Sequence, residues 1–291
     1  MSNFNPNDSL GALPPADIAN YLLSIDDIDG ANNFLTPGVV GQGFSPFHPS
    51  YGYTGLAIGF IPAGSTAQNG KISIEGANNI DPDASLINER IKITLDKFYI
   101  DSYPGAGQHE ILCEFAGKNQ IATETEELRF ALRAFANDGE SASVNGHPIF
   151  KGLTVGANGI SFEGRTINIR SRSDSTLLSA LDSSTFKSGL SLITMAQPAL
   201  KPFADLAGSV VKVALSRSAN RQVHSFNVGL DFSQNNTSAR LRLGSYVIVQ
   251  ISEANWNWGS VYWDINSQAM KSTLGVAPRA NYIVLGVSPF V

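Results

Sequence analysis

The most concentrated chemical signal in this chain is an aromatic cluster near its C-terminus. Trp256, Trp258 and Trp263 are the three tryptophans of the sequence, and Tyr262 lies among them. In an extended segment Trp256 and Trp258 point to one side, with asparagines on the other. Such rings can anchor a protein–protein interface, or stack on a sugar whose hydroxyls bind the neighbouring amides. Packing at the corner of a sheet is a third interpretation, and it requires no ligand.

Histidine and thiol chemistry have little support in the residue spacing. The histidines are His48, His109, His147 and His224, and no pair has the spacing of a zinc site on a helix. Cys113 is the only cysteine, so no disulfide can form within the chain and we expect a buried thiol. Four residues at about 3.3 Å each separate His109 from Cys113 by roughly 13 Å along an expected strand, whereas a nucleophile and its base meet at about 3 Å. We therefore expect structural roles for the histidines.

Paired carboxylates fail as a glycosidase site on the same geometry. Glu110 and Glu114 lie roughly 13 Å apart along one expected strand, and the reaction needs a separation of about 5–9.5 Å. The sequence contains no Gly-x-Ser-x-Gly elbow, phosphate-binding loop or dinucleotide-binding motif. Acids from different strands could still converge, but the sequence by itself predicts a protein that is not an enzyme.

Calcium is the one cofactor for which the sequence offers a candidate. Asp26, Asp27 and Asp29 precede a glycine as in an EF-hand loop, but the first ligand position is Ile25 and the twelfth is Thr36 instead of glutamate. Other acidic turns contain Asp81, Asp83, Asp101, Asp138 and Glu140. A β-sandwich could gather such turns at one end around calcium, and solvated turn residues are the alternative. We expect no metal site and no other cofactor.

The charge balance argues against nucleic acid as a direct partner. The net charge is −5, from 20 Lys and Arg against 25 Asp and Glu, and no basic run occurs. A solvated strand face explains the densest basic stretch, Arg165–Arg172, without a phosphate ligand. Charged residues make up 15% of the chain, below the roughly 25% usual for soluble domains. Because interface cores are depleted in charge, this composition suits a surface that meets other proteins.

The N-terminus lacks the charged and apolar regions of a signal peptide, and no run of about 18 uncharged apolar residues occurs. We therefore expect a cytoplasmic protein, with a membrane an unlikely partner. A pore-forming alternative exists, because such proteins often hide a membrane hairpin in a polar segment such as Ser171–Thr194. There, however, leucines follow helical spacing and prolines come soon after, which favours a helix.

Alternating hydrophobicity sets the expected fold class. Val223–Phe232 places an apolar residue or histidine at every second position, a polar turn follows, and the alternation resumes up to Ile251. This pattern predicts a β-hairpin with one face on a core. Further strands are expected at 55–61, 71–75, 90–100, 109–116, 127–136, 148–155 and 159–170. The alternation slips at Asp96 and Lys97, which indicates a bulge.

Residues 1–54 are expected to form an arm, a short helix and a wrapping segment. Residues 1–13 predict a flexible arm, and Pro14 and Pro15 then open a helix with one apolar face. That face comprises Ile18, Tyr21, Leu22 and Ile25. The stretch 26–54 is rich in Gly, Asn and Pro, carries aromatic residues, and should pack against its own sandwich or a neighbouring subunit.

Residues 174–219 break the β pattern and predict a helical insert. Asp174 can cap a short helix, and a longer helix has Pro202 near its first turn. The short helix presents Leu177, Leu178 and Leu181, and the longer one presents Phe203, Leu206, Ala207, Val210, Val213 and Ala214. We expect one mainly β domain over 55–291, an antiparallel β-sandwich that is C2-like or jelly-roll-like, with this insert and the short N-terminal helix.

These observations favour an interaction or assembly protein without enzymatic activity. Its expected partners are proteins, including further copies of the chain in a homo-oligomer, and its expected contact residues are Trp256, Trp258, Tyr262 and Trp263. A carbohydrate-binding module, assisted by calcium, and a membrane-acting pore former are the alternatives.

Overall fold

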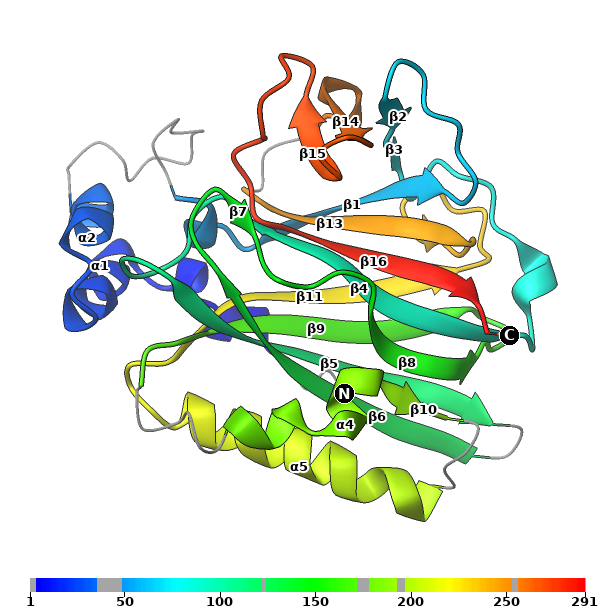
Figure 1. Cartoon of the computed structure of the whole chain (residues 1–291), viewed down its shortest axis with the longest axis horizontal. Coiled ribbons are helices and arrows are strands. Elements are labelled where there is room, and N and C mark those ends of the chain that lie inside the picture. The colour runs from blue at the N-terminus through cyan, green and yellow to red at the C-terminus, as the bar shows by residue number, and fades with distance from the viewer. Residues whose placement is uncertain are drawn as a thin grey trace.

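The computed structural model describes residues 4–35, 49–121, 124–171, 178–192, 197–252 and 256–290. Two large sheets pack face to face as a β-sandwich, and a third, smaller sheet lies on the outer side of the larger one (Figure 1). The predicted fold class, a mainly β sandwich with a helical insert, is confirmed.

The larger sheet has eight strands in the described part of the chain. Seven follow the order β10-β8-β4-β16-β13-β1-β3, and β7 pairs with β4. Their bounds are β1 Gly55–Pro62, β3 Glu75–Gly76, β4 Arg90–Ile100, β7 Glu140–Ser141, β8 His147–Thr154, β10 Leu190–Ser191, β13 Gly244–Ile251 and β16 Tyr282–Pro289. β10 runs parallel to β8, and β4, β16, β13 and β1 are antiparallel neighbours.

The second large sheet has five strands among the described residues, in the order β12-β11-β9-β5-β6. Their bounds are β5 His109–Ile121, β6 Glu124–Ala136, β9 Ile160–Ile169, β11 Arg221–Asp231 and β12 Ala239–Arg240. The third sheet joins β15 (Ala269–Ser272), β14 (Val261–Asp264) and β2 (Lys71–Ser73), all antiparallel.

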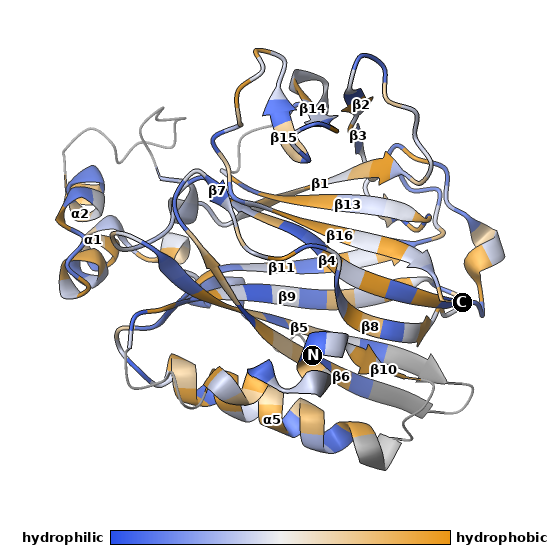
Figure 2. Cartoon of the chain, viewed as in Figure 1, coloured by the Kyte–Doolittle hydropathy of each residue, from blue (hydrophilic) through white to orange (hydrophobic). Residues whose placement is uncertain are grey.

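Helices close one end of the sandwich and cover part of the second sheet. The α-helices are α1 Pro15–Ser24, α2 Ile28–Leu35, α4 Ser184–Ser188 and α5 Gln197–Leu215. The 3₁₀ turns are η1 Pro6–Asp8, η2 Leu10–Ala12, η3 Ser50–Gly52, η4 Ala84–Leu86, η6 Ser179–Asp182 and η7 Trp258–Ser260. α5 lies along β6, and Figure 2 shows apolar positions recurring along it while apolar and polar positions alternate along β4.

One apolar cluster fills the sandwich and includes side chains from the first 54 residues. Phe60, Phe115 and Tyr246 are among its fully buried members. Phe4 and Leu10 are buried as well, within and beside the turns η1 and η2. The expectation of a flexible arm is therefore wrong for residues 4–12, because these two side chains remove apolar surface from water when they pack on the sheet.

The hairpin expected at 223–251 is wrong in its pairing. β11 pairs with β9 in the second sheet, whereas β13 lies between β1 and β16 in the larger one. The connection crosses between sheets and is held by Tyr246, whose hydroxyl accepts the Arg242 N–H at 2.8 Å and donates to the Arg240 carbonyl at 2.8 Å. The third sheet covers the outer side of β13, so both faces of this strand are buried. Because its apolar residues do not mark a single core face, the sequence pattern did not identify its partner strands.

The other predicted strands are confirmed, except the one at 71–75. The predicted bulge is also confirmed. Leu95 pairs with Leu285 and Lys97 with Val284, which leaves Asp96 without an opposite residue. The strand expected at 71–75 is two strands, β2 and β3, which belong to different sheets.

The N-terminal helix is confirmed as α1, and the long helix is confirmed as α5, although α5 begins at Gln197 and Pro202 lies inside it instead of near its first turn. α1 buries Ile18, Tyr21 and Leu22 as expected. On α5 the exposed residues include Leu206 and Val213, whereas Ala207, Val210, Val211 and Ala214 are buried. The buried face of α5 is therefore rotated relative to the expected one, since Val211 is buried while Leu206 and Val213 are exposed. Asp174 and Leu177 lie outside the described residues, and Leu178 and Leu181 are buried.

Candidate functional site

The tryptophan cluster lies in the layer that covers the larger sheet from outside. β14, β15 and β2 form this outer layer with η7, and its apolar residues make a second cluster with outward side chains of β13 and β16. Tyr99 and Tyr282 stack there with ring centroids 5.0 Å apart. The Tyr282 hydroxyl accepts the Met270 N–H at 3.0 Å, which ties β15 to the larger sheet.

All three tryptophans pack against this second cluster and are half-buried. Trp256 and Trp258 meet edge to face, with centroids 5.8 Å apart and planes at 69°. Trp258 lies over β1, where a Cβ added to Gly59 would be 2.5 Å from the indole ring. Glycine at position 59 therefore allows the indole to approach the sheet, and this contact is a packing role.

Tyr262 has a different environment from the tryptophans. Its neighbours on β14, Val261 and Trp263, pack toward the larger sheet, so Tyr262 occupies the opposite face of the outer layer. Lys71 Nζ lies 4.5 Å from the centroid of its ring. The structure thus brings the three tryptophans together and places Tyr262 apart from them, beside a cation.

Sequence reasoning missed two exposed apolar residues in the loop after β15. Leu274 is 87% exposed and Val276 is 59% exposed. The loop is held in place, because the Thr273 N–H donates to the Ser260 carbonyl at 2.9 Å and the Ser272 N–H donates to the Val276 carbonyl at 2.7 Å. We name Leu274 and Val276, with their hydrogen-bonded loop, the apolar tip. Leu274 and Val276 flank a glycine and show no hydrophobic periodicity, so the sequence pattern did not indicate that they are exposed.

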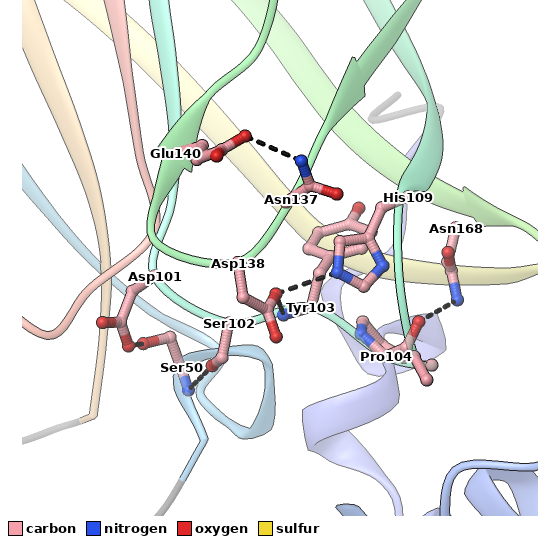
Figure 3. Close-up of polar contacts among 12 residues, drawn as sticks. Ser50, Asp101, Ser102, Tyr103, Pro104, His109, Asn137, Asp138, Glu140 and Asn168 are labelled. Atoms are coloured by element: carbon pink, nitrogen blue, oxygen red, sulfur yellow. Dashed lines mark hydrogen bonds and ion pairs between the residues drawn. The ribbon is translucent and has the colours of Figure 1, made fainter.

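A second concentration of polar side chains closes one end of the sandwich (Figure 3). Ser50 Oγ donates to Asp101 Oδ2 at 2.6 Å, and burial raises the pKa of this carboxyl. Asp138 Oδ1 accepts the Tyr103 N–H at 2.8 Å and lies 2.9 Å from His109 Nε2. These bonds join the segment near residue 50, the loop after β4 and the turn between β6 and β7.

The His109–Asp138 pair orients loops and has no activated nucleophile beside it among the described residues. His109 is fully buried, and its Nδ1 has no hydrogen-bond partner. Cys113 lies further along the same strand face, and burial raises the pKa of its thiol to about 12. Because the thiolate is the reactive form, this cysteine is inert at neutral pH in the folded chain.

Each of the two acids on β5 is paired with arginine. Glu114 is fully buried, with Oε2 2.6 Å from Arg165 Nε and Oε1 3.3 Å from Arg129 Nε. Burial raises the pKa of Glu114, while both arginines act in the opposite direction. Glu110 Oε1 lies 3.2 Å from Arg133 Nη1. These carboxylates therefore work as ion-pair partners within the fold.

The acidic turns make structural contacts. Asp27 accepts the Gly30 N–H and the Gly105 N–H, both at 2.8 Å, so it joins the start of α2 to the loop after β4. Asp83 accepts the Ser85 N–H at 3.1 Å and caps η4. Across the described ranges, no three His, Cys, Asp or Glu side chains gather closely enough to hold a metal ion. Thr36 and His48 lie outside those ranges.

Comparisons with protein-family models, curated protein sequences and solved structures found no match for this chain. None of the helices described has the length and apolar character that a membrane crossing requires. The candidate site is therefore interpreted from its own geometry: an outer layer anchored by tryptophans, with an apolar tip in solvent.

Proposed function

We propose that this chain is a non-enzymatic interaction protein that assembles with further copies of itself in the cytoplasm and needs no cofactor. The observation that supports the proposal is the apolar tip, where Leu274 is 87% exposed and Val276 is 59% exposed beside the tryptophan-bearing layer. A partner that covers these two side chains would remove their apolar surface from water, and the fixed loop means that little order has to be gained on contact.

The contact would be made through side chains and not by strand addition. On β15 the Met270 N–H bonds to the Tyr282 hydroxyl, and the Ser272 N–H bonds to the Val276 carbonyl. On β2 the Lys71 N–H donates to the Gln68 carbonyl at 3.0 Å. These backbone donors already have partners, so the edges of the outer layer offer little for an incoming strand.

The energetic effect can be bounded from the two side chains. Full burial of a valine or leucine contributes about 1.5–3 kcal/mol. A charged residue in place of each removes that contribution and adds a desolvation cost. Because about 1.4 kcal/mol changes a dissociation constant tenfold, the double replacement should weaken assembly at least about a hundredfold.

The test is light scattering on a size-exclusion column across protein concentrations, with and without calcium. We expect a defined oligomer for the natural chain and a 31.0 kDa monomer for Leu274→Asp/Val276→Asp. Leu206→Lys is the matched control, because Leu206 is an exposed apolar residue on α5, away from the outer layer, and it should leave the oligomer intact. A natural chain that is monomeric at every concentration would overturn the proposal, as would an oligomer that survives the double replacement.

A further inference from the structure

A small cavity lined by both polar and apolar side chains, among them Phe98 and Ile248, lies between the two large sheets. Its volume is about 10 Å³. Thr166 and His224 line it from the second sheet, Gln250 from the larger sheet, Asn281 from the position before β16, and Tyr103 from the loop after β4. All five residues are buried. A cavity of about 10–15 Å³ admits one water molecule when it also offers two to four polar partners.

His224 supplies a hydrogen-bond acceptor at this cavity. The side chain is 5% exposed, and its Nε2 has no hydrogen-bond partner. The backbone of Gly55 hydrogen-bonds to the imidazole and raises its pKa, as a carbonyl acceptor does, so Nδ1 carries the proton. Burial is the larger effect and lowers the pKa to about 4. The ring is therefore neutral at neutral pH, and Nε2 presents a lone pair that needs a donor.

The two amide side chains in the wall are already committed to other partners. Gln250 Nε2 donates to the Tyr53 carbonyl at 2.6 Å, and its oxygen accepts from Asn281 Nδ2 at 3.0 Å. Asn281 Oδ1 accepts the Asp101 N–H at 2.9 Å. Gln250 Nε2 uses its second N–H on the Val223 carbonyl at 3.4 Å, whereas Asn281 Nδ2 has a second N–H beyond the one that it donates to Gln250.

Hydroxyl groups complete the wall. The Tyr103 hydroxyl is buried and makes no hydrogen bond of good geometry within the protein. Thr166 lies close enough to lower the pKa of Tyr103, although burial raises that pKa more strongly. Tyr103 and His224 therefore line one small cavity, and each has a buried polar atom without a hydrogen-bond partner.

We propose that this cavity is a binding site for a single water molecule, which donates a hydrogen bond to His224 Nε2 and accepts one from the Tyr103 hydroxyl. Thr166 is the third partner, which matches the usual coordination of a buried water. The water links β11 of the second sheet to the loop that follows β4 of the larger sheet. It thereby satisfies two buried polar atoms that the protein does not pair with each other.

The direct test is a crystal structure of the full chain at neutral pH, at a resolution that shows single waters. We expect one isolated density peak within about 3.2 Å of both His224 Nε2 and the Tyr103 oxygen. A cavity without density would overturn the proposal, and so would a direct hydrogen bond between the Tyr103 hydroxyl and Nε2.

A solution test uses the ¹⁵N resonance of His224 Nε2, which distinguishes a hydrogen-bonded acceptor from a free one. Thr166→Ile adds a carbon atom that fills the cavity and should move the resonance to the free-acceptor position. Ile149→Val is the control, because Ile149 belongs to the same apolar core but does not line the cavity, so the resonance should stay in place. A free-acceptor resonance in the natural chain would contradict the proposal, as would a resonance unchanged by Thr166→Ile. If the larger side chain prevents folding, the crystal structure and the natural chain's resonance still decide.

Discussion

His224 provides a measurable link between pH and stability. Its imidazole is buried between the sheets, and burial lowers its pKa to about 4 from a reference value of 6.5. The unfolded chain therefore binds a proton at a higher pH than the folded chain does. Stability is fully present above about pH 6.5 and is lost as the pH falls toward about 4.

The magnitude follows from the difference between the two pKa values. About 2.5 units at about 1.4 kcal/mol each correspond to about 3–4 kcal/mol of unfolding free energy. At about pH 4.5, where the folded ring is still mostly neutral, about 2.5 kcal/mol of this is already lost. Burial raises the pKa values of Asp96, Asp101 and Glu114, which changes stability in the opposite direction. A variant is therefore needed to isolate the contribution of His224.

The assay is urea unfolding followed by tryptophan fluorescence at about pH 7.5 and about pH 4.5. His224→Gln should lose about 2.5 kcal/mol less than the natural chain between the two conditions. Ile149→Val, in the same core but away from the cavity and without a titrating group, should keep the pH difference of the natural chain. If His224→Gln loses as much stability on acidification as the natural chain, the reasoning from burial is refuted.

Three further predictions rest on packing, on an ion pair and on a thiol. Gly59→Ala should lower the free energy of unfolding in urea by about 1–3 kcal/mol, because the added Cβ meets the Trp258 ring. Gly229→Ala is the control and should be nearly neutral, because no atom lies within 4 Å of its added Cβ. Equal effects of the two replacements would contradict the contact. Glu114→Ala should destabilise the chain by about 3–5 kcal/mol, and Glu114→Gln by less, since only glutamine leaves a polar side chain at position 114 for Arg165 and Arg129. An unchanged urea midpoint for Glu114→Ala would count against a buried ion pair. Cys113 should resist a thiol reagent in the folded chain and react after unfolding, because it is fully buried; rapid labelling of the native protein would disprove this.

The elements that sequence reasoning located best are those whose burial repeats along the local backbone. β4 and its bulge at Asp96, and the apolar face of α1, follow from residue types at fixed spacing. α5 was located by the same rule, but its buried face was assigned with Leu206 and Val213, which are exposed. A helix with apolar residues around much of its circumference does not by itself determine which face meets the sheet.

For the candidate site, the sequence alone identified the tryptophan cluster as chemically distinct, because residue type and spacing are local properties. It could not show that these indoles rest on Gly59 and the larger sheet, or that Leu274 and Val276 extend into solvent beside them. It also could not place His224 and Tyr103 at one cavity, since they come from opposite sides of the sandwich.

Residue types and their spacing established that the chain is built of strands, where most of them lie, and that α1 and the helical insert interrupt the strand pattern. The packing of the folded chain was needed to show that β11 and β13 belong to different sheets, that a third sheet covers the outer face of β13, and that two arginines contact Glu114. The physical reason is that hydrophobic periodicity records which side of a segment leaves water, whereas pairing depends on contacts between residues far apart in the chain.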